Sequence, residues 1–132
     1  MSRSAQLSAT VLICTYNRAE LLAETLLSLR RTRTTRQWEI VVVDNNSTDN
    51  TRAVVERFAT EMPVPLHYVF ERRQGKSYAL NTGQEQSWGE LIVYTDDDVR
   101  VAPGWLDAAC NPLDTDPTID YTGGPEIGRA HV

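Results

Sequence analysis

Three consecutive aspartates, Asp96, Asp97 and Asp98, follow the short apolar run Leu91–Tyr94 after a single residue, Thr95. Carboxylates this close disfavour one another's ionised forms, and a divalent cation removes that conflict. Mg²⁺ and Mn²⁺ prefer oxygen ligands, and Mg²⁺ is commonly held by one or two carboxylates together with substrate phosphates. While the chain stays extended, Asp96 and Asp98 point the same way and are the candidate metal ligands. An acidic loop that caps the next helix is an equally good interpretation of the spacing alone.

Three further apolar runs also lead into polar residues, and all four runs are expected strands. They span residues 10–14, 40–43, 66–70 and 91–94, and the polar residues after the first three are Thr15–Arg18, Asp44–Asn46 and Glu71–Arg73. Asp44 has the position from which a carboxylate accepts a hydrogen bond from a ribose hydroxyl or a base N–H, although it also suits a simple turn.

Helical patterns separate these runs. Leu22, Leu26 and Leu29 form one apolar face within residues 19–30, and further helices are expected near 48–59, from Gly75 through Gly83, and from Pro103. The order β-α-β-α-β-α-β-α predicts an α/β fold with a mostly parallel sheet and helices on both faces. Ligands of such sheets bind beyond the carboxyl ends of the strands, where the polar residues would meet.

Composition excludes several classes of protein. The 132 residues (14.9 kDa) are 41% hydrophobic and 23% charged, which fits one compact unit, and the net charge of −5 gives no basic footprint for nucleic acid. No apolar run approaches the roughly 20 residues of a membrane span, and the N-terminus lacks a secretory signal. Two cysteines form no disulfide framework, so a cytoplasmic location is expected. The glycine motifs of dinucleotide dehydrogenases and P-loop NTPases are absent.

Four segments resemble, in order and spacing, the donor-binding half of family 2 glycosyltransferases, which have the GT-A fold with its Rossmann-like nucleotide-binding half. The segments are Thr10–Arg18 (TVLICTYNR), Glu39–Asp49 (EIVVVDNNSTD), Gln74–Asn81 (QGKSYALN) and Leu91–Asp98 (LIVYTDDD). The resemblance covers about residues 9–125. It implies metal-dependent transfer of a sugar, with inversion, from a nucleoside-diphosphate sugar, commonly UDP-linked, to an unknown saccharide, lipid or protein acceptor.

The resemblance also implies roles for individual residues. Thr15 and Tyr16 would line the nucleotide pocket, Asp44 would contact the base, and Lys76, with Arg72 as a neighbour, would lie near the nucleotide. The remaining roles fall on the acidic run: Asp96 would reach the ribose and the metal, and Asp98 would coordinate Mg²⁺ or Mn²⁺. Asp97, also expected among the residues that bind the nucleotide-sugar, would help to orient either neighbour.

The family pattern stops near Pro125, so we expect residues 1–125 to be the nucleotide-sugar-binding part and residues 126–132, which resemble a translated sequencing adapter, to be a non-native tail. The general base is then expected beyond residue 125, and the chain is expected to be a fragment. Peripheral association with the inner membrane face through missing segments stays open, because many relatives glycosylate envelope lipids or polysaccharides. Two alternatives also stay open: a non-catalytic nucleotide-binding module of the same fold, and a nucleotidyltransferase, although Thr15–Arg18 lacks the glycine-rich basic signature that the latter needs.

Overall fold

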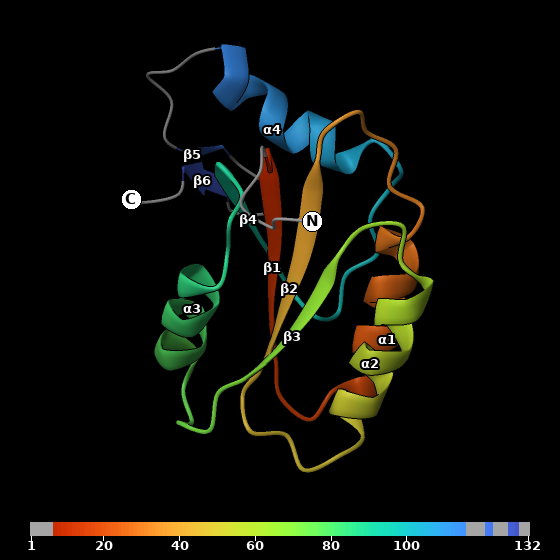
Figure 1. Cartoon of the computed structure of the whole chain (residues 1–132), viewed down its shortest axis with the longest axis vertical. Coiled ribbons are helices and arrows are strands. Elements are labelled where there is room, and N and C mark those ends of the chain that lie inside the picture. The colour runs from red at the N-terminus through yellow and green to blue at the C-terminus, as the bar shows by residue number, and fades with distance from the viewer. Residues whose placement is uncertain (1–6, 116–120, 123–126, 130–132) are drawn as a thin grey trace.

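The computed structural model describes residues 7–115, 121–122 and 127–129, and in it helices flank a central sheet (Figure 1). The strands are β1 (Ala9–Thr15), β2 (Trp38–Asp44), β3 (Leu66–Phe70), β4 (Leu91–Thr95), β5 (Tyr121–Thr122) and β6 (Ile127–Arg129). The helices are α1 (Ala19–Leu29), α2 (Thr51–Glu61), α3 (Lys76–Glu85) and α4 (Trp105–Thr115).

The sheet has the strand order β3-β2-β1-β4-β6-β5. Strands β1 to β4 are parallel to one another, whereas β6 is antiparallel to both β4 and β5. The chain first moves from β1 outward to β2 and β3 and then returns to place β4 on the other side of β1. The strand order therefore reverses at β1, which is the position where open α/β sheets form a ligand crevice at their carboxyl edge.

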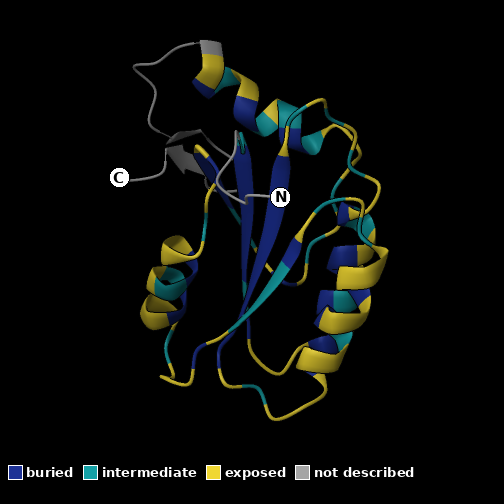
Figure 2. Ribbon diagram, viewed as in Figure 1, coloured by how far each residue is buried: buried dark blue, intermediate teal, exposed yellow. Residues whose placement is uncertain are grey.

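Alternating side chains of the strands build a core on each face of the sheet. The larger core joins Val11, Ile13 and Val42 to buried residues of α1, α2 and α4, and the smaller one joins Leu12 and Val43 to α3. All seven residues of β2 are buried, as expected for a central strand covered on both sides (Figure 2). The predicted α/β fold, with a mostly parallel sheet and helices on both faces, is confirmed.

Helix α3 packs unusually close to the sheet because Gly83 has no side chain. A Cβ atom placed there would lie 2.4 Å from Leu12 Cδ1 and 2.9 Å from Val43 Cγ2. This close approach fixes the height of α3 over β1 and β2, and so the position of its first turn at the carboxyl edge.

Two predicted helix starts are wrong by a few residues. The helix expected near residue 48 begins at Thr51, because the backbone N–H groups of Thr48 and Asp49 donate to Asn17 Oδ1 in the neighbouring loop. The helix expected to start at Pro103 begins at Trp105, because the Pro103 carbonyl accepts a hydrogen bond from Arg33 N and so belongs to a loop contact.

The predicted boundary at residue 125 stays a prediction. Residues 127–129 of the expected tail form β6, which pairs with β4 from Leu91 to Val93, while residues 126 and 130–132 lie outside the described residues. No helix in the described ranges is both long and apolar enough to cross a bilayer.

Candidate functional site

A cavity of about 1180 Å³ lies at the carboxyl edge of the sheet. It is bounded by the ends of β1 and β4, the turn after β2 and the start of α3. Its lining contains six of the predicted site residues, namely Thr15, Tyr16, Lys76, Asp96, Asp97 and Asp98. The cavity therefore brings together residues more than 80 positions apart at the place that the strand order predicts.

The three aspartates differ in exposure. Strand β4 ends at Thr95, after which Asp96 and Asp98 are exposed and Asp97 is buried. Asp97 Oδ2 accepts a hydrogen bond of 2.8 Å from the Thr15 hydroxyl. The Asp97 carboxylate therefore points into the protein and joins the end of β4 to β1, whereas Asp96 and Asp98 are exposed to solvent.

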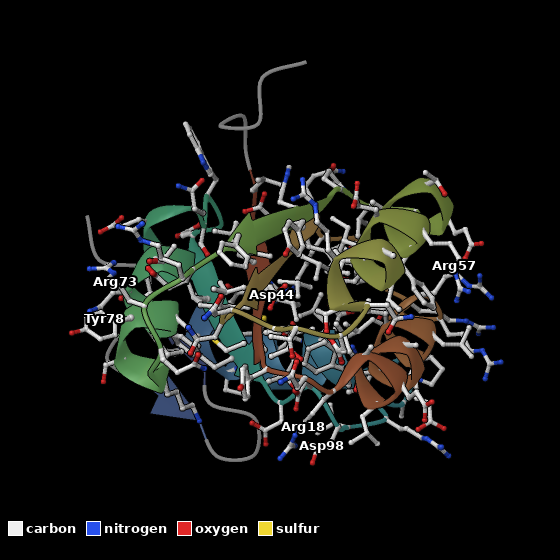
Figure 3. All side chains as sticks on the ribbon, turned by 90° about the horizontal axis from the view of Figure 1, so that it is seen from below. Arg18, Asp44, Arg57, Arg73, Tyr78 and Asp98 are labelled. Carbon is white, nitrogen blue, oxygen red and sulfur yellow. The ribbon has the colours of Figure 1, made fainter. Side chains whose placement is uncertain are left out.

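Arg18 is the counter-charge of this acidic segment. Its Nη1 lies 3.4 Å from Asp97 Oδ1 and 3.4 Å from Asp98 Oδ2, and Figure 3 shows the labelled Arg18 and Asp98 side by side. The Arg18 side chain is 51% exposed, so each contact is a weak, water-screened ion pair. Since these contacts join the acidic segment to the loop after β1, they favour a convergent site over a helix cap.

Asp44 lies behind the cavity and is not part of its lining. It is 2% exposed, its Oδ1 accepts from Ser47 N at 2.9 Å, and its Oδ2 accepts from the Tyr68 hydroxyl at 2.6 Å. Burial and the Asp44 carboxylate both raise the pKa of Tyr68, so the phenol stays a hydrogen-bond donor. These contacts stabilise the turn after β2, and the predicted contact of Asp44 with a base stays a prediction.

Asn45 lines the cavity in place of its neighbour, and the sequence reasoning missed it. Successive residues of a strand point to opposite faces, so Asn45 follows Val43 on the α3 face, whereas Asp44 follows Val42 on the other. This alternation was a signal that could have distinguished them. Cys14, Gln74 and Gly75 also line the cavity without having been predicted.

Of the two predicted basic residues, Lys76 lines the cavity and Arg72 does not. Lys76 is the first residue of α3, which places its charge at the helix N-terminus. Arg73 turns to Glu71, donating to both carboxylate oxygens at 2.8 and 3.1 Å, and stacks over the Tyr78 ring at 4.7 Å (Figure 3). Hydrogen bonds from Arg73 and Thr82 lower the pKa of Glu71 to about 2.

Within the described ranges, no group of three or more His, Cys, Asp or Glu side chains is arranged to hold a metal ion. Asp97 is engaged by Thr15 and Arg18, and Asp98 makes only the weak exposed pair with Arg18, so Asp96 and Asp98 are the two exposed carboxylates that line the cavity. These two carboxylates fit a site at which Mg²⁺ is held by one or two carboxylates together with substrate phosphates. Such a site does not need the protein to supply all the metal ligands.

Comparison with known families decides the class of protein. The sequence pattern of Glycosyl transferase family 2 matches residues 10–129. The chain belongs to this family. The pattern that matches is one of glycosyltransferases and not of nucleotidyltransferases.

Curated relatives are about one third identical to this chain over the residues that align. It is 36% identical over 96 residues to the succinoglycan biosynthesis protein ExoM of Rhizobium meliloti, a match that covers 71% of this chain and 31% of that protein. It is 30% identical over 116 residues to glycosyltransferase AglE of Haloferax volcanii, covering 87% and 38%. The chain therefore spans about a third of the length of these relatives.

Solved family 2 structures share the fold and contain nucleotide ligands. Mannosyltransferase PcManGT from Pyrobaculum calidifontis, in complex with GDP-Man and Mn²⁺, is 38% identical with a TM-score of 0.80, covering 89% of this chain and 35% of that one. TarS from S. aureus, residues 1–349 in complex with UDP, is 27% identical with a TM-score of 0.74, covering 83% and 32%.

Proposed function

We propose that this chain is the donor-binding part of a metal-dependent, inverting glycosyltransferase that uses a nucleoside-diphosphate sugar, UDP-linked, as donor. The observation that carries the proposal is that Thr15, Lys76, Asp96 and Asp98 line one cavity at the carboxyl edge of the sheet. It offers oxygen ligands for a cation and a cationic side chain for a diphosphate. PcManGT and TarS, which were solved with GDP-Man and Mn²⁺ and with UDP, support this reading.

Each residue then has a role in holding the donor. Thr15 and Tyr16 line the nucleotide end of the cavity, and Lys76 faces the diphosphate from the N-terminus of α3, where the helix dipole also favours negative charge. Asp96 reaches the ribose and, with Asp98, would hold Mg²⁺ or Mn²⁺. Asp97 orients both neighbours through its bond to Thr15.

The chemistry of transfer needs charge neutralisation on the departing diphosphate. Bound Mg²⁺ or Mn²⁺ supplies Lewis-acid stabilisation of that charge. Lys76 adds a second positive charge in the same cavity, and a positioned base must remove the proton of the acceptor hydroxyl. We assign no residue of 1–125 to the base, and an acceptor among envelope saccharides or lipids is consistent with the succinoglycan relative.

Calorimetric titration of the chain with UDP and with GDP, each with and without Mn²⁺, tests the proposal. We expect UDP to bind and Mn²⁺ to tighten its binding at least about tenfold, and Asp98→Asn to abolish that gain. Glu90→Gln is the matched control, because it removes one exposed carboxylate just before β4, at the strand end away from the cavity. Metal-independent binding in wild type, or an unchanged metal effect in Asp98→Asn, would overturn the metal role.

A separate measurement distinguishes an enzyme from a binding module. Hydrolysis or transfer of UDP-sugars is followed in the presence of Mn²⁺ for this chain and for any longer native sequence found to contain it. Binding with no turnover in either would support the non-catalytic module.

A further inference from the structure

The buried side chain of Asn45 holds the loop that leads into α3. Its Nδ2 donates to the carbonyl oxygens of Glu71 at 3.1 Å and Arg73 at 2.7 Å, and its Oδ1 accepts from the backbone N–H of Gly75 at 3.0 Å. Asn45 is only 5% exposed. Since the amide N–H groups and the amide oxygen all make hydrogen bonds, the side chain is held in one orientation. These hydrogen bonds fix residues 71–75.

The backbone of Asn45 connects the same loop to the central strand. Its N–H donates to the Thr15 carbonyl at 2.9 Å, and its carbonyl accepts from Gln74 Nε2 at 3.0 Å. One residue thus joins the end of β1 to the loop before α3. Both partners, Thr15 and Gln74, line the cavity.

The position of Lys76 depends on this loop. Gly75, which directly precedes Lys76, has a φ of 138°, a conformation that residues with side chains rarely adopt. The N–H of Gly75 is the group that Asn45 Oδ1 accepts from, so Asn45 fixes the chain at the point where it turns into α3. If that hydrogen bond were lost, Lys76 and the first turn of α3 would be free to shift relative to the cavity.

We infer that Asn45 is a positioning residue for the diphosphate of the donor, acting through residues 71–76 rather than by contact with the base. This inference rests on the proposed function, because it assumes that Lys76 faces the phosphates. It makes a specific distinction: a residue that contacts the base changes the affinity for a nucleoside, whereas a residue that positions Lys76 changes only the part of the affinity that the phosphates supply.

Titration of Asn45→Ala with UDP and with uridine tests this distinction. We expect the Kd for UDP to rise at least about tenfold, while the Kd for uridine stays within about twofold of wild type. Asn50→Ala is the matched control, because Asn50 is exposed before α2 and its side chain makes no capping hydrogen bond. The control should leave both values unchanged.

Other outcomes are equally informative. A proportional loss of UDP and uridine binding, or no loss of either, would overturn the inference while the proposed function stands. Failure of wild type to bind UDP would overturn the proposed function and this inference with it. General unfolding of the variant would be seen as a loss of far-UV circular dichroism.

A second variant and a ligand-free measurement keep the test valid if Asn45→Ala folds poorly. Asn45→Ser keeps a polar side chain and adds no charge, but it is too short to reach Gly75 N–H and both carbonyls together, so UDP affinity should again fall more than uridine affinity. In hydrogen exchange without ligand, Asn45→Ser should speed exchange of the Gly75 amide relative to wild type and Asn50→Ala. An unchanged exchange rate of the Gly75 amide would contradict the inference that Asn45 fixes this loop.

Discussion

The Thr15 hydroxyl and the Asp97 carboxylate, 82 positions apart in the chain, share a buried hydrogen bond of 2.8 Å. Thr15 ends β1 and Asp97 follows β4, so this bond joins the two central strands where the cavity opens. It turns the middle aspartate inward and leaves Asp96 and Asp98 exposed. The geometry of the acidic segment therefore depends on a residue of the first strand.

Thr15→Val should weaken both the fold and ligand binding. It is nearly isosteric but removes the hydroxyl, and we expect a loss of about 1 kcal/mol in the free energy of unfolding, measured by urea denaturation. Binding of UDP with Mn²⁺ should weaken as well, because the acidic segment loses its anchor. Thr15→Ser keeps the hydroxyl and should restore most of both quantities. Equal behaviour of the two variants would contradict the anchoring role.

Arg18→Gln should increase the affinity of the chain for Mn²⁺ alone. The guanidinium lies 3.4 Å from carboxylate oxygens of Asp97 and Asp98, so it competes with an added cation. Because the pair is exposed, we expect a gain of about two- to fivefold, measured by Mn²⁺ electron paramagnetic resonance titration without nucleotide.

Arg30→Gln is the matched control for this change. Arg30 follows the C-terminal end of α1, where it pairs with Glu61 at 3.6 Å, and should not affect the titration. A weaker affinity for Mn²⁺ in Arg18→Gln would show that Arg18 supports the cation rather than opposing it.

Glu71 should make the fold sensitive to acid. Its pKa is about 2 in the folded chain against an ordinary 4.5, so the folded state binds the proton less readily than the unfolded state. The stabilisation is therefore complete above about pH 4.5 and is lost as the pH falls from 4.5 toward 2. Thermal melting across this range should show a shallower decline for Glu71→Gln than for wild type. Identical slopes would mean that the Arg73 pairing does not contribute.

Gly83→Ala should destabilise the chain, because the added methyl group meets Leu12 Cδ1 at 2.4 Å and Val43 Cγ2 at 2.9 Å. We expect a loss of about 1–3 kcal/mol in the free energy of unfolding. Gly104→Ala is the control, since its added methyl group meets nothing within 4 Å and should change stability by less than about 0.5 kcal/mol. A Gly83→Ala variant as stable as wild type would contradict the close packing of α3.

The strands and their polar ends could be predicted because each apolar run is short, buried and sharply bounded. The runs 40–43 and 91–94 both lie within observed strands, and the residues after them reach one edge of the sheet. Helix starts were less accurate. The start of α2 depends on Asn17, a residue of a different loop, and local patterns cannot show that contact.

The sequence could not show which of two adjacent polar residues lines the cavity. The position of Asp44 at the end of its strand and the family resemblance both pointed to Asp44, yet the alternation of β2 places Asn45 on the cavity side. Arg72 was expected near the nucleotide, but nothing in the sequence distinguishes it from Arg73. Neither residue lines the cavity. Asp97 was expected only to help its neighbours, and its burial against Thr15 depends on the packing of β1 beside β4.

The most direct test of the central claim is a chemical-shift map of the ¹⁵N-labelled chain titrated with UDP and Mg²⁺. A donor site at the carboxyl edge predicts that the backbone amides of residues 15–18, 74–76 and 95–98 shift together, with the same apparent Kd. Amides at the opposite edge of the sheet, such as those of Trp88 and Gly89, should not move. Shifts confined to that opposite edge, or no shifts at millimolar UDP, would contradict the proposed donor site.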